Sequence, residues 1–168
     1  RSCLVGSEMC IRDRYRPKII AEISGNHNGS LKKAIKLIEA AKKSGADFVK
    51  LQTYTADTLT LKSSNKDFQI TDKKSLWTGE TLYNLYKKAY TPWEWHKKLF
   101  QVAKKNKITI FSTPFDETAV DFLEKLNTPA YKIASFENNH IPLLQKILKT
   151  KKPLIVSTGI TSKKNLDE

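Results

Sequence analysis

The feature that most constrains the fold of this chain is a set of five short apolar runs, each ending in polar residues. In the clearest run, 130–137, apolar residues are interrupted by Lys132, Ser135 and Glu137, which offer a cation, a hydroxyl and a carboxylate. Nearly continuous apolar runs of this kind are typical of strands buried on both faces of a parallel sheet. We therefore predict five strands, within residues 18–29, 48–54, 108–116, 130–137 and 153–159, whose polar ends converge on one site.

Amphipathic segments separate the runs and predict helices. The first follows Ser30, a residue suited to cap a helix, and ends before Gly45, which suits a left-handed C-terminal position. A later helix is predicted to begin at Thr91-Pro92-Trp93-Glu94, with Thr91 as its cap and Pro92 in its first turn. Apolar residues at helical spacing predict these buried faces: Leu31, Ala34, Ile35, Ile38 and Ala41; Trp95, Leu99, Val102 and Ala103; Ala119, Val120, Leu123 and Leu126; Leu143, Leu144, Ile147 and Leu148.

The alternation of strands and helices predicts an α/β fold with helices covering a parallel sheet. Five units are too few to close an eight-stranded barrel, so the prediction is the N-terminal five βα units of a TIM (β/α)8 barrel, truncated. A complete open doubly wound sheet is the alternative, but no glycine-rich fingerprint follows the first strand. The long connection 54–90 is expected to have a function, because such loops often cover a site.

The chain is strongly basic, with 30 Lys+Arg against 17 Asp+Glu and a net charge of +13 in 168 residues. This balance fits either a nucleic-acid-binding module or an enzyme for anionic substrates. Against the first, many lysines fall on the outer faces of predicted helices and no Arg, the usual reader of base edges, follows Arg16. No apolar run is long enough to span a membrane and no signal peptide is recognisable, so a cytoplasmic location is expected.

Residues 1–14 differ from the rest of the chain in lacking Lys and an amphipathic period. Segment 4–14 resembles a translated sequencing adapter, so we predict a non-native leader, with a natural disordered leader as the alternative. Residues 15–168 are then one partial barrel domain. Cys3 and Cys10 both lie in the leader, and no disulfide, thiolate metal site or cysteine nucleophile is inferred from them.

In a barrel of this kind, side chains at the C-terminal ends of strands face the active site. Two lysines with several hydroxyls suit a phosphate, or a phosphate and a carboxylate, while two glutamates can act as acid and base or orient the lysines. A lone His27 in a polar turn is expected to be a loop hydrogen-bonder, His96 and His140 to be structural or exposed, and no histidine pair has ligand spacing. The candidate residues are Glu22, Asn26, His27, Lys50, Gln52, Thr113, Lys132, Ser135, Glu137, Ser157 and Thr158.

Five motifs in order resemble the sialic acid synthase family: 20–29 (IAEISGNHNG), 49–53 (VKLQT), 111–115 (FSTPF), 130–137 (AYKIASFE) and 156–159 (VSTG). Segments 24–29, 81–86, 90–96 and 135–137 look most like the pseudaminic acid synthase branch of that family. The resemblance implies a transferase that condenses phosphoenolpyruvate with an open-chain 6-deoxy diacetamido hexose, forms a nine-carbon 2-keto acid and releases phosphate. A synthase for N-acetylneuraminate or legionaminate is the near alternative, and a Lys-rich nucleic-acid-binding module the remote one.

The resemblance also implies roles for individual residues. Glu22 and Glu137 would lie near the reacting carbons, and Gln52 near the sugar. The divalent metal of the family, Mn²⁺ or Mg²⁺, is bound by histidines of later strands, so we expect no metal ligands in this chain and an inactive fragment on its own. A homodimer is expected only for the full-length protein, and neither nucleic acid nor membrane is expected as a partner. The residues implied to hold the phosphate and carboxylate of phosphoenolpyruvate are Lys50, Thr113, Lys132, Ser135 and Ser157.

Overall fold

The computed structural model describes residues 17–162 and 164. Its five strands form one sheet in the order of the sequence, and every neighbouring pair is parallel. An open doubly wound sheet would reverse its strand order at the switch point, so the sequential order excludes that alternative. The sheet is a curled half-barrel of five βα units, as predicted. The strands are β1 (Ile20–Glu22), β2 (Phe48–Thr53), β3 (Thr109–Pro114), β4 (Tyr131–Ile133) and β5 (Leu154–Val156).

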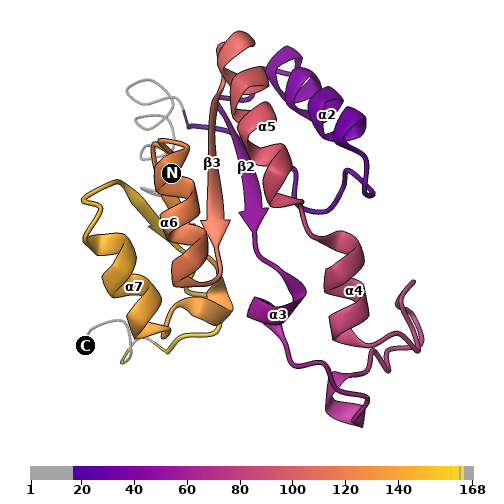
Figure 1. Ribbon diagram of the computed structural model, residues 1–168. Helices are drawn as coiled ribbons and strands as arrows, with labels where there is room; N and C mark the ends of the chain where they lie inside the picture. Colours follow the sequence, from indigo (N-terminus) through magenta and orange to yellow (C-terminus); the bar gives the residue numbers. More distant parts are fainter. Residues whose placement is uncertain (1–16, 163, 165–168) are drawn as a thin grey trace, which may run out of the picture.

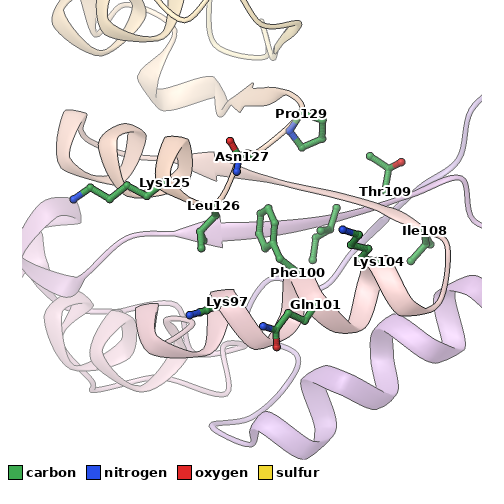
Figure 2. Close-up of a pocket in the computed structure, with 11 residues that line it drawn as sticks. Lys97, Phe100, Gln101, Lys104, Ile108, Thr109, Lys125, Leu126, Asn127 and Pro129 are labelled. Carbon is green, nitrogen blue, oxygen red and sulfur yellow. The ribbon is translucent and has the colours of Figure 1, made fainter.

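Four helices cover the outer face of the sheet, in the row α7, α6, α5, α2 from left to right in Figure 1. Neighbouring helices α5 and α6 leave a groove between them near the start of β3, which Figure 2 shows in close-up. The four are α2 (Leu31–Lys43), α5 (Trp93–Lys105), α6 (Glu117–Lys125) and α7 (Ile141–Leu148). The connection between β2 and α5 adds α3 (Ala56–Leu59), the 3-10 turn η1 (Lys66–Phe68) and α4 (Leu82–Ala89), and a second 3-10 turn, η2 (Ser135–Glu137), follows β4.

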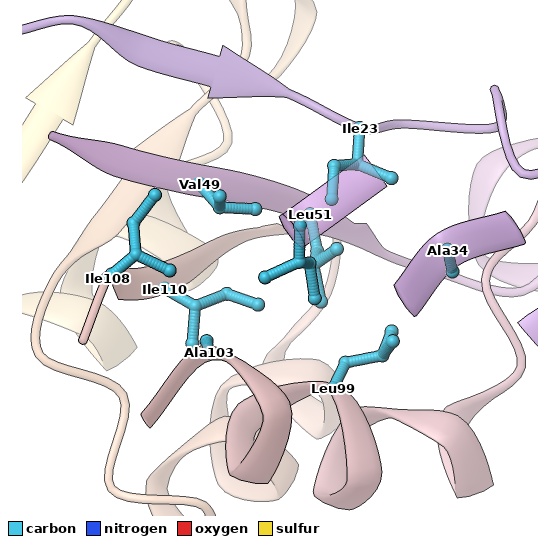
Figure 3. Close-up of a cluster of buried hydrophobic side chains, with 9 residues drawn as sticks. Ile23, Ala34, Val49, Leu51, Leu99, Ala103, Ile108 and Ile110 are labelled. Carbon is cyan, nitrogen blue, oxygen red and sulfur yellow. The ribbon is translucent and has the colours of Figure 1, made fainter. Parts of the chain in front are cut away.

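The core lies between the sheet and these helices. Figure 3 shows one cluster, in which Val49, Leu51 and Ile110 of the sheet pack against Leu99 and Ala103 of α5. A second cluster packs two residues of β4 against α6 and α7: Tyr131, Ile133, Val120, Leu123, Leu143 and Ile147. Because side chains of a strand alternate between its faces, the residues between these point to the concave, barrel-interior face. That face is apolar toward the N-terminal ends of the strands, where Ile20, Phe48, Phe111 and Ile155 line a pocket of about 280 Å³.

The helix ends largely follow the local sequence. The Ser30 side chain accepts a hydrogen bond from the Lys33 amide, as a cap should, and Gly45 has φ 85°. The same left-handed position recurs two or three residues after the other outer helices, at Lys107 (φ 53°), Asn127 (φ 55°) and Lys151 (φ 56°). Each helix therefore turns into the next strand through one left-handed residue, and at two of the four positions that residue is a lysine.

Two expectations about the helices are wrong. Pro92, not Thr91, is the N-cap of α5, and no side chain caps that helix. Thr91 is buried, and its hydroxyl instead bonds His27 Nε2 at 3.1 Å, so it ties the start of α5 to the turn after β1. Leu148 was expected on the inner face of α7, but it is the last residue of that helix and is 64% exposed, because the chain there turns back toward β5.

The predicted strand 130–137 is shorter than expected. Only Tyr131–Ile133 is a strand. The last ladder bond runs from the Ser157 amide to the Ile133 carbonyl, and the Glu137 amide then donates to the Ala134 carbonyl to close the 3-10 turn. Ser135 and Glu137 thus lie on a turn above the sheet edge. The first and fifth strands are also shorter than their apolar runs, and as the two ends of the strand order they form the sheet's exposed edges.

The predicted leader 1–14 lies outside the described residues. In the described part of the chain, no helix has both the length and the apolar character needed to cross a membrane.

Candidate functional site

Polar side chains of several strands share the concave face at the C-terminal end of the sheet. Glu22 of β1 is paired in register with Lys50 of β2, and Gln52 with Thr113 of β3. Their neighbours along each strand, such as Leu51, are buried against the helices. The two-residue period of a strand therefore places these polar residues together on the opposite face. In Figure 1 the strand arrows point toward the end of the molecule at which α3 and α4 lie.

Lys50 is the centre of the first half of the site. Its ammonium group forms an ion pair with the Glu22 carboxylate and donates to the Thr113 hydroxyl at 3.4 Å. The turn after β1 closes over this pair: the Ser24 amide donates to Glu22 Oε1 at 3.0 Å, and the Ser24 hydroxyl donates to Gln52 Oε1 at 2.9 Å. The Lys50 side chain is only 14% exposed, so its charge is held in a fixed place by three strands.

Lys132 is the centre of the second half. Its ammonium group donates to the Ile133 carbonyl at 2.8 Å and to the Ser157 hydroxyl, which follows β5. Burial lowers the pKa of Lys132, and the positive charge of Lys50 lowers it further, while Glu22 and Glu137 act in the opposite direction. The two ammonium groups therefore repel one another across the concave face. An anion between them would relieve that repulsion.

Glu137 of η2 contributes a half-buried carboxylate. Burial raises the pKa of Glu137, opposed by a backbone hydrogen bond and by the charges of His140 and Lys132. Its Oε2 atom is buried and has no hydrogen-bond partner among residues 17–162 and 164. A buried polar atom without a partner is costly, so this oxygen is suited to accept a hydrogen bond from a ligand, or to carry a proton.

The loop after β5 lies directly against the turn that carries Ser135. A Cβ atom at Gly159 would lie 3.1 Å from the Ser135 hydroxyl oxygen, so a glycine permits this close approach. Asn138 holds the same loop through its side-chain amide, which donates to the Thr161 hydroxyl and, at 3.5 Å, to the Ser157 carbonyl. These contacts hold the loop after β5 beside η2, and they keep Ser157 next to Lys132.

A cavity of about 560 Å³ opens next to Gln52 and Glu137. Its wall is mainly apolar and aromatic, and Tyr54 contacts both Tyr86 and Phe115 edge to face, with centroid distances of 6.0 and 5.4 Å. The long connection 54–90 supplies much of this wall, in agreement with its expected role over a site. The lining residues are Gln52, Tyr54, Leu59, Leu82, Tyr86, Phe115, Ala134, Phe136 and Glu137.

Three candidates take no part in this arrangement. His27 is fully buried: its Nδ1 accepts from the Gly29 amide at 3.1 Å and its Nε2 bonds Thr91, so it is a structural loop residue, as expected. Asn26 and Thr158 are exposed, and no side-chain partner in the described chain ties them to the site.

Sequence reasoning missed the aromatic wall. Tyr54 and Phe115 directly follow β2 and β3, so their place at the strand ends was a signal that could have identified them. Two of the three tryptophans take no part in this wall: Trp93 stacks on Phe122 at 4.7 Å, and Trp95 packs on the core.

No metal site forms within residues 17–162 and 164: no cluster of three or more His, Cys, Asp or Glu is placed to hold an ion. The polar groups of the concave face are instead two ammonium groups, several hydroxyls, an amide and two carboxylates. This donor set fits an anionic ligand.

The fold is a partial (βα) barrel in which Lys50 and Lys132 share the concave face near the C-terminal ends of the strands. The sequence profile described as the NeuB family matches residues 37–168, and the chain belongs to that family.

The chain is similar to several synthases of nine-carbon sugar acids. The chain is 50% identical over 152 residues to a pseudaminic acid synthase of Helicobacter pylori, covering 90% of this chain and 44% of the relative. It is 40% identical over 151 residues to an N,N'-diacetyllegionaminic acid synthase of Campylobacter jejuni, covering 89% and 44%. Among solved structures, an N-acetylneuraminic acid synthetase from Leptospira borgpetersenii matches with a TM-score of 0.75 and 27% identity, over 90% of this chain and 48% of that one. The chain therefore spans less than half the length of these relatives.

Proposed function

We propose that this chain is the N-terminal part of a nonulosonic acid synthase, a transferase that condenses phosphoenolpyruvate with a diacetamido 6-deoxy hexose to form pseudaminic acid. The observation that carries the proposal is the pair Lys50 and Lys132, which face one concave surface with hydroxyl partners of their own. The similarity to proteins named pseudaminic acid synthase supports the choice of product class.

Phosphoenolpyruvate carries a phosphate and a carboxylate on the same carbon, so it needs two cationic positions close together. Lys50 and Lys132 supply them, and each ammonium group has three donors, of which some remain for the ligand. Thr113 and Ser157 add hydroxyl donors beside them, and Ser135 of η2 is proposed to add a third. Both lysines are poorly solvated on the concave face, and their positive charges repel each other. An anion bound between them would reduce this repulsion and accept charge-assisted hydrogen bonds from both ammonium groups.

The sugar is proposed to occupy the cavity beside Gln52. The Oε1 atom of Gln52 is taken by Ser24, which orients the amide nitrogen as a free donor for a sugar oxygen. The apolar wall around Tyr54 suits the methyl groups of a deoxy, N-acetylated sugar better than additional hydroxyls. Glu137 lines this cavity, and its unpartnered oxygen is proposed to accept a hydrogen bond from the sugar.

In the proposed reaction, C3 of phosphoenolpyruvate forms a bond to the sugar's aldehyde carbon, whose oxygen takes up a proton. Water then adds at C2 and gives one proton back to Glu137. The resulting tetrahedral carbon loses its bond to the phosphate oxygen, and the phosphate leaves with the proton of the C2 hydroxyl, so that a ketone and free phosphate form. Glu137, with its raised pKa, is the group proposed to give the proton to the aldehyde oxygen. Glu22 is proposed to orient Lys50 through their ion pair.

The family resemblance also implies a divalent cation. The described residues offer it no ligand cluster, so no step is assigned to it here, and its ligands are proposed to come from sequence beyond this chain. A homodimer, too, is proposed to need sequence beyond this chain.

The test is phosphate release by the complete product of the gene, supplied with phosphoenolpyruvate, sugar and Mn²⁺ or Mg²⁺. Release should require both sugar and phosphoenolpyruvate. Lys132→Ala removes two charge-assisted contacts and should lower kcat/KM by about 100-fold. Lys146→Ala, which removes an exposed ion pair on α7, is the matched control and should change it less than twofold.

Near-normal turnover by Lys132→Ala would refute the assignment of the anion site. The choice of sugar is tested separately, by comparing a diacetamido 6-deoxy hexose with N-acetylmannosamine. Faster turnover of N-acetylmannosamine would replace pseudaminic acid with N-acetylneuraminate as the product and leave the anion site in place.

A further inference from the structure

The groove between α5 and α6 lies at the opposite end of the sheet from the candidate active site. Its volume is about 650 Å³, within the range of sites for small ligands. The floor is apolar: Phe100 of α5 faces Leu126, with Ile108 and Ile110 below and Pro129 at the edge. Figure 2 shows the Phe100 ring in the middle of the groove, beside Leu126.

Cationic and amide groups surround this floor. Lys97, Gln101 and Lys104 are spaced by four and three residues along α5, so they share one face of that helix. Lys125 and Asn127 stand on the α6 side. No carboxylate of the described residues lines the groove.

The three groove lysines differ from several others in the described chain. Lys146 and Lys152, on nearby surfaces, are paired with carboxylates. Within residues 17–162 and 164, the side chains of Lys97, Lys104 and Lys125 form no hydrogen bond or ion pair. An open apolar floor under unpaired ammonium groups is complementary to a ligand that is itself apolar on one side and negative on the other.

We propose that this groove binds an amphiphilic anion of nucleotide size: a ring system that stacks on Phe100 and carries a phosphate, carboxylate or sulfonate between Lys97 and Lys104. Removal of the ring's apolar surface from water supplies affinity, while the ammonium groups fix the orientation. Gln101 and Asn127 offer amide donors and acceptors to the edge of the ring. The ligand's charge makes binding sensitive to salt, because all three lysines are exposed.

The probe is anilinonaphthalene sulfonate, an aromatic anion whose fluorescence rises on apolar surfaces. The double variant Lys97→Gln/Lys104→Gln should raise its Kd about tenfold. The matched control, Lys98→Gln/Lys105→Gln, removes the same charge from other faces of the same helix and should change the Kd less than twofold. All four positions are exposed, so both variants should keep the fold, which circular dichroism checks.

Nuclear magnetic resonance locates the site. The probe should shift the side-chain amide signals of Gln101 and Asn127, and adenosine monophosphate should displace it, whereas the same concentration of inorganic phosphate should not. The proposal is overturned by equal affinity of the two double variants. It is also overturned by shifts confined to the apolar concave face around Phe48 and Ile155, or by equal competition from phosphate, since the apolar floor would then have no role.

Discussion

His96 should make the protein lose stability as the pH falls through the weakly acidic range. Its ring is fully buried between α5 and the sheet, and its Nδ1–H can only donate to the Pro92 carbonyl oxygen at 3.2 Å. Nε2 must then accept from the Thr53 hydroxyl at 2.9 Å, and the Thr53 oxygen in turn accepts from the Ser112 hydroxyl at 2.7 Å. The ring is neutral in this arrangement, and a proton on Nε2 would place a charge in the core.

The magnitude follows from the shift in pKa. Burial lowers the pKa of His96 from 6.5 to about 4. Since the unfolded chain then binds the proton more readily, His96 costs no stability above pH 6.5, and stability falls as the pH drops from there to about 4. The full loss is about 3 kcal/mol, and between pH 7 and pH 5 it is about 2 kcal/mol. Burial lowers the pKa of His27 too, which acts in the same direction.

Urea unfolding at pH 7 and pH 5 measures the effect. A loss of about 2 kcal/mol should lower the urea midpoint by about 1 M. The His96→Gln variant is less stable at neutral pH but cannot take up the proton, so its free energy of unfolding should change by about 2 kcal/mol less between the two conditions. His140→Gln, at a partly exposed position, is the control and should keep the native pH dependence. The reasoning fails if native protein and His96→Gln lose equal stability.

Three further substitutions test the packing. Tyr131→Phe removes the bond of a buried hydroxyl to Glu124 (2.5 Å) and should cost ~1–2 kcal/mol in thermal unfolding, whereas Tyr83→Phe, with an exposed hydroxyl, should cost almost nothing. Equal losses would contradict the role of burial. Gly25→Ala places a Cβ 2.8 Å from the last carbonyl oxygen of α4 and should lower stability by ~1–3 kcal/mol, and an unchanged melting temperature would show that this contact is loose. Lys107→Gly relieves a left-handed lysine and should raise stability by up to about 1 kcal/mol, which chemical denaturation would detect; a fall would mean that the lysine is unstrained.

Local patterns in the sequence were sufficient for much of the fold. The run 48–53 is β2, Ser30 caps α2, and the left-handed position at Gly45 is occupied as expected, because each depends on neighbouring residues alone. The alternation of strand residues also predicted that Lys50 and Lys132 would lie at strand ends of one sheet. The roles of the site residues toward phosphoenolpyruvate and sugar stay predictions.

Tertiary contacts determined the structure at positions where the local sequence predicted something else or gave no prediction. Thr91 has the sequence of a cap but bonds His27, 64 residues earlier in the chain. The aromatic wall of the cavity also depends on tertiary contacts, because it brings α4 against the ends of β2 and β3.

The sequence by itself thus determined most elements of this protein: the number and order of the strands, the four outer helices with most of their buried faces, and the chemical types at the strand ends. Only the tertiary structure decided which of those groups meet. Lys50 reaches Thr113 across 63 residues, and Lys132 reaches Ser157 across 25. The physical reason is that helix and strand periods are local properties of the chain. The partner of a charge instead depends on strand register and on the space left by distant side chains, which no local pattern encodes.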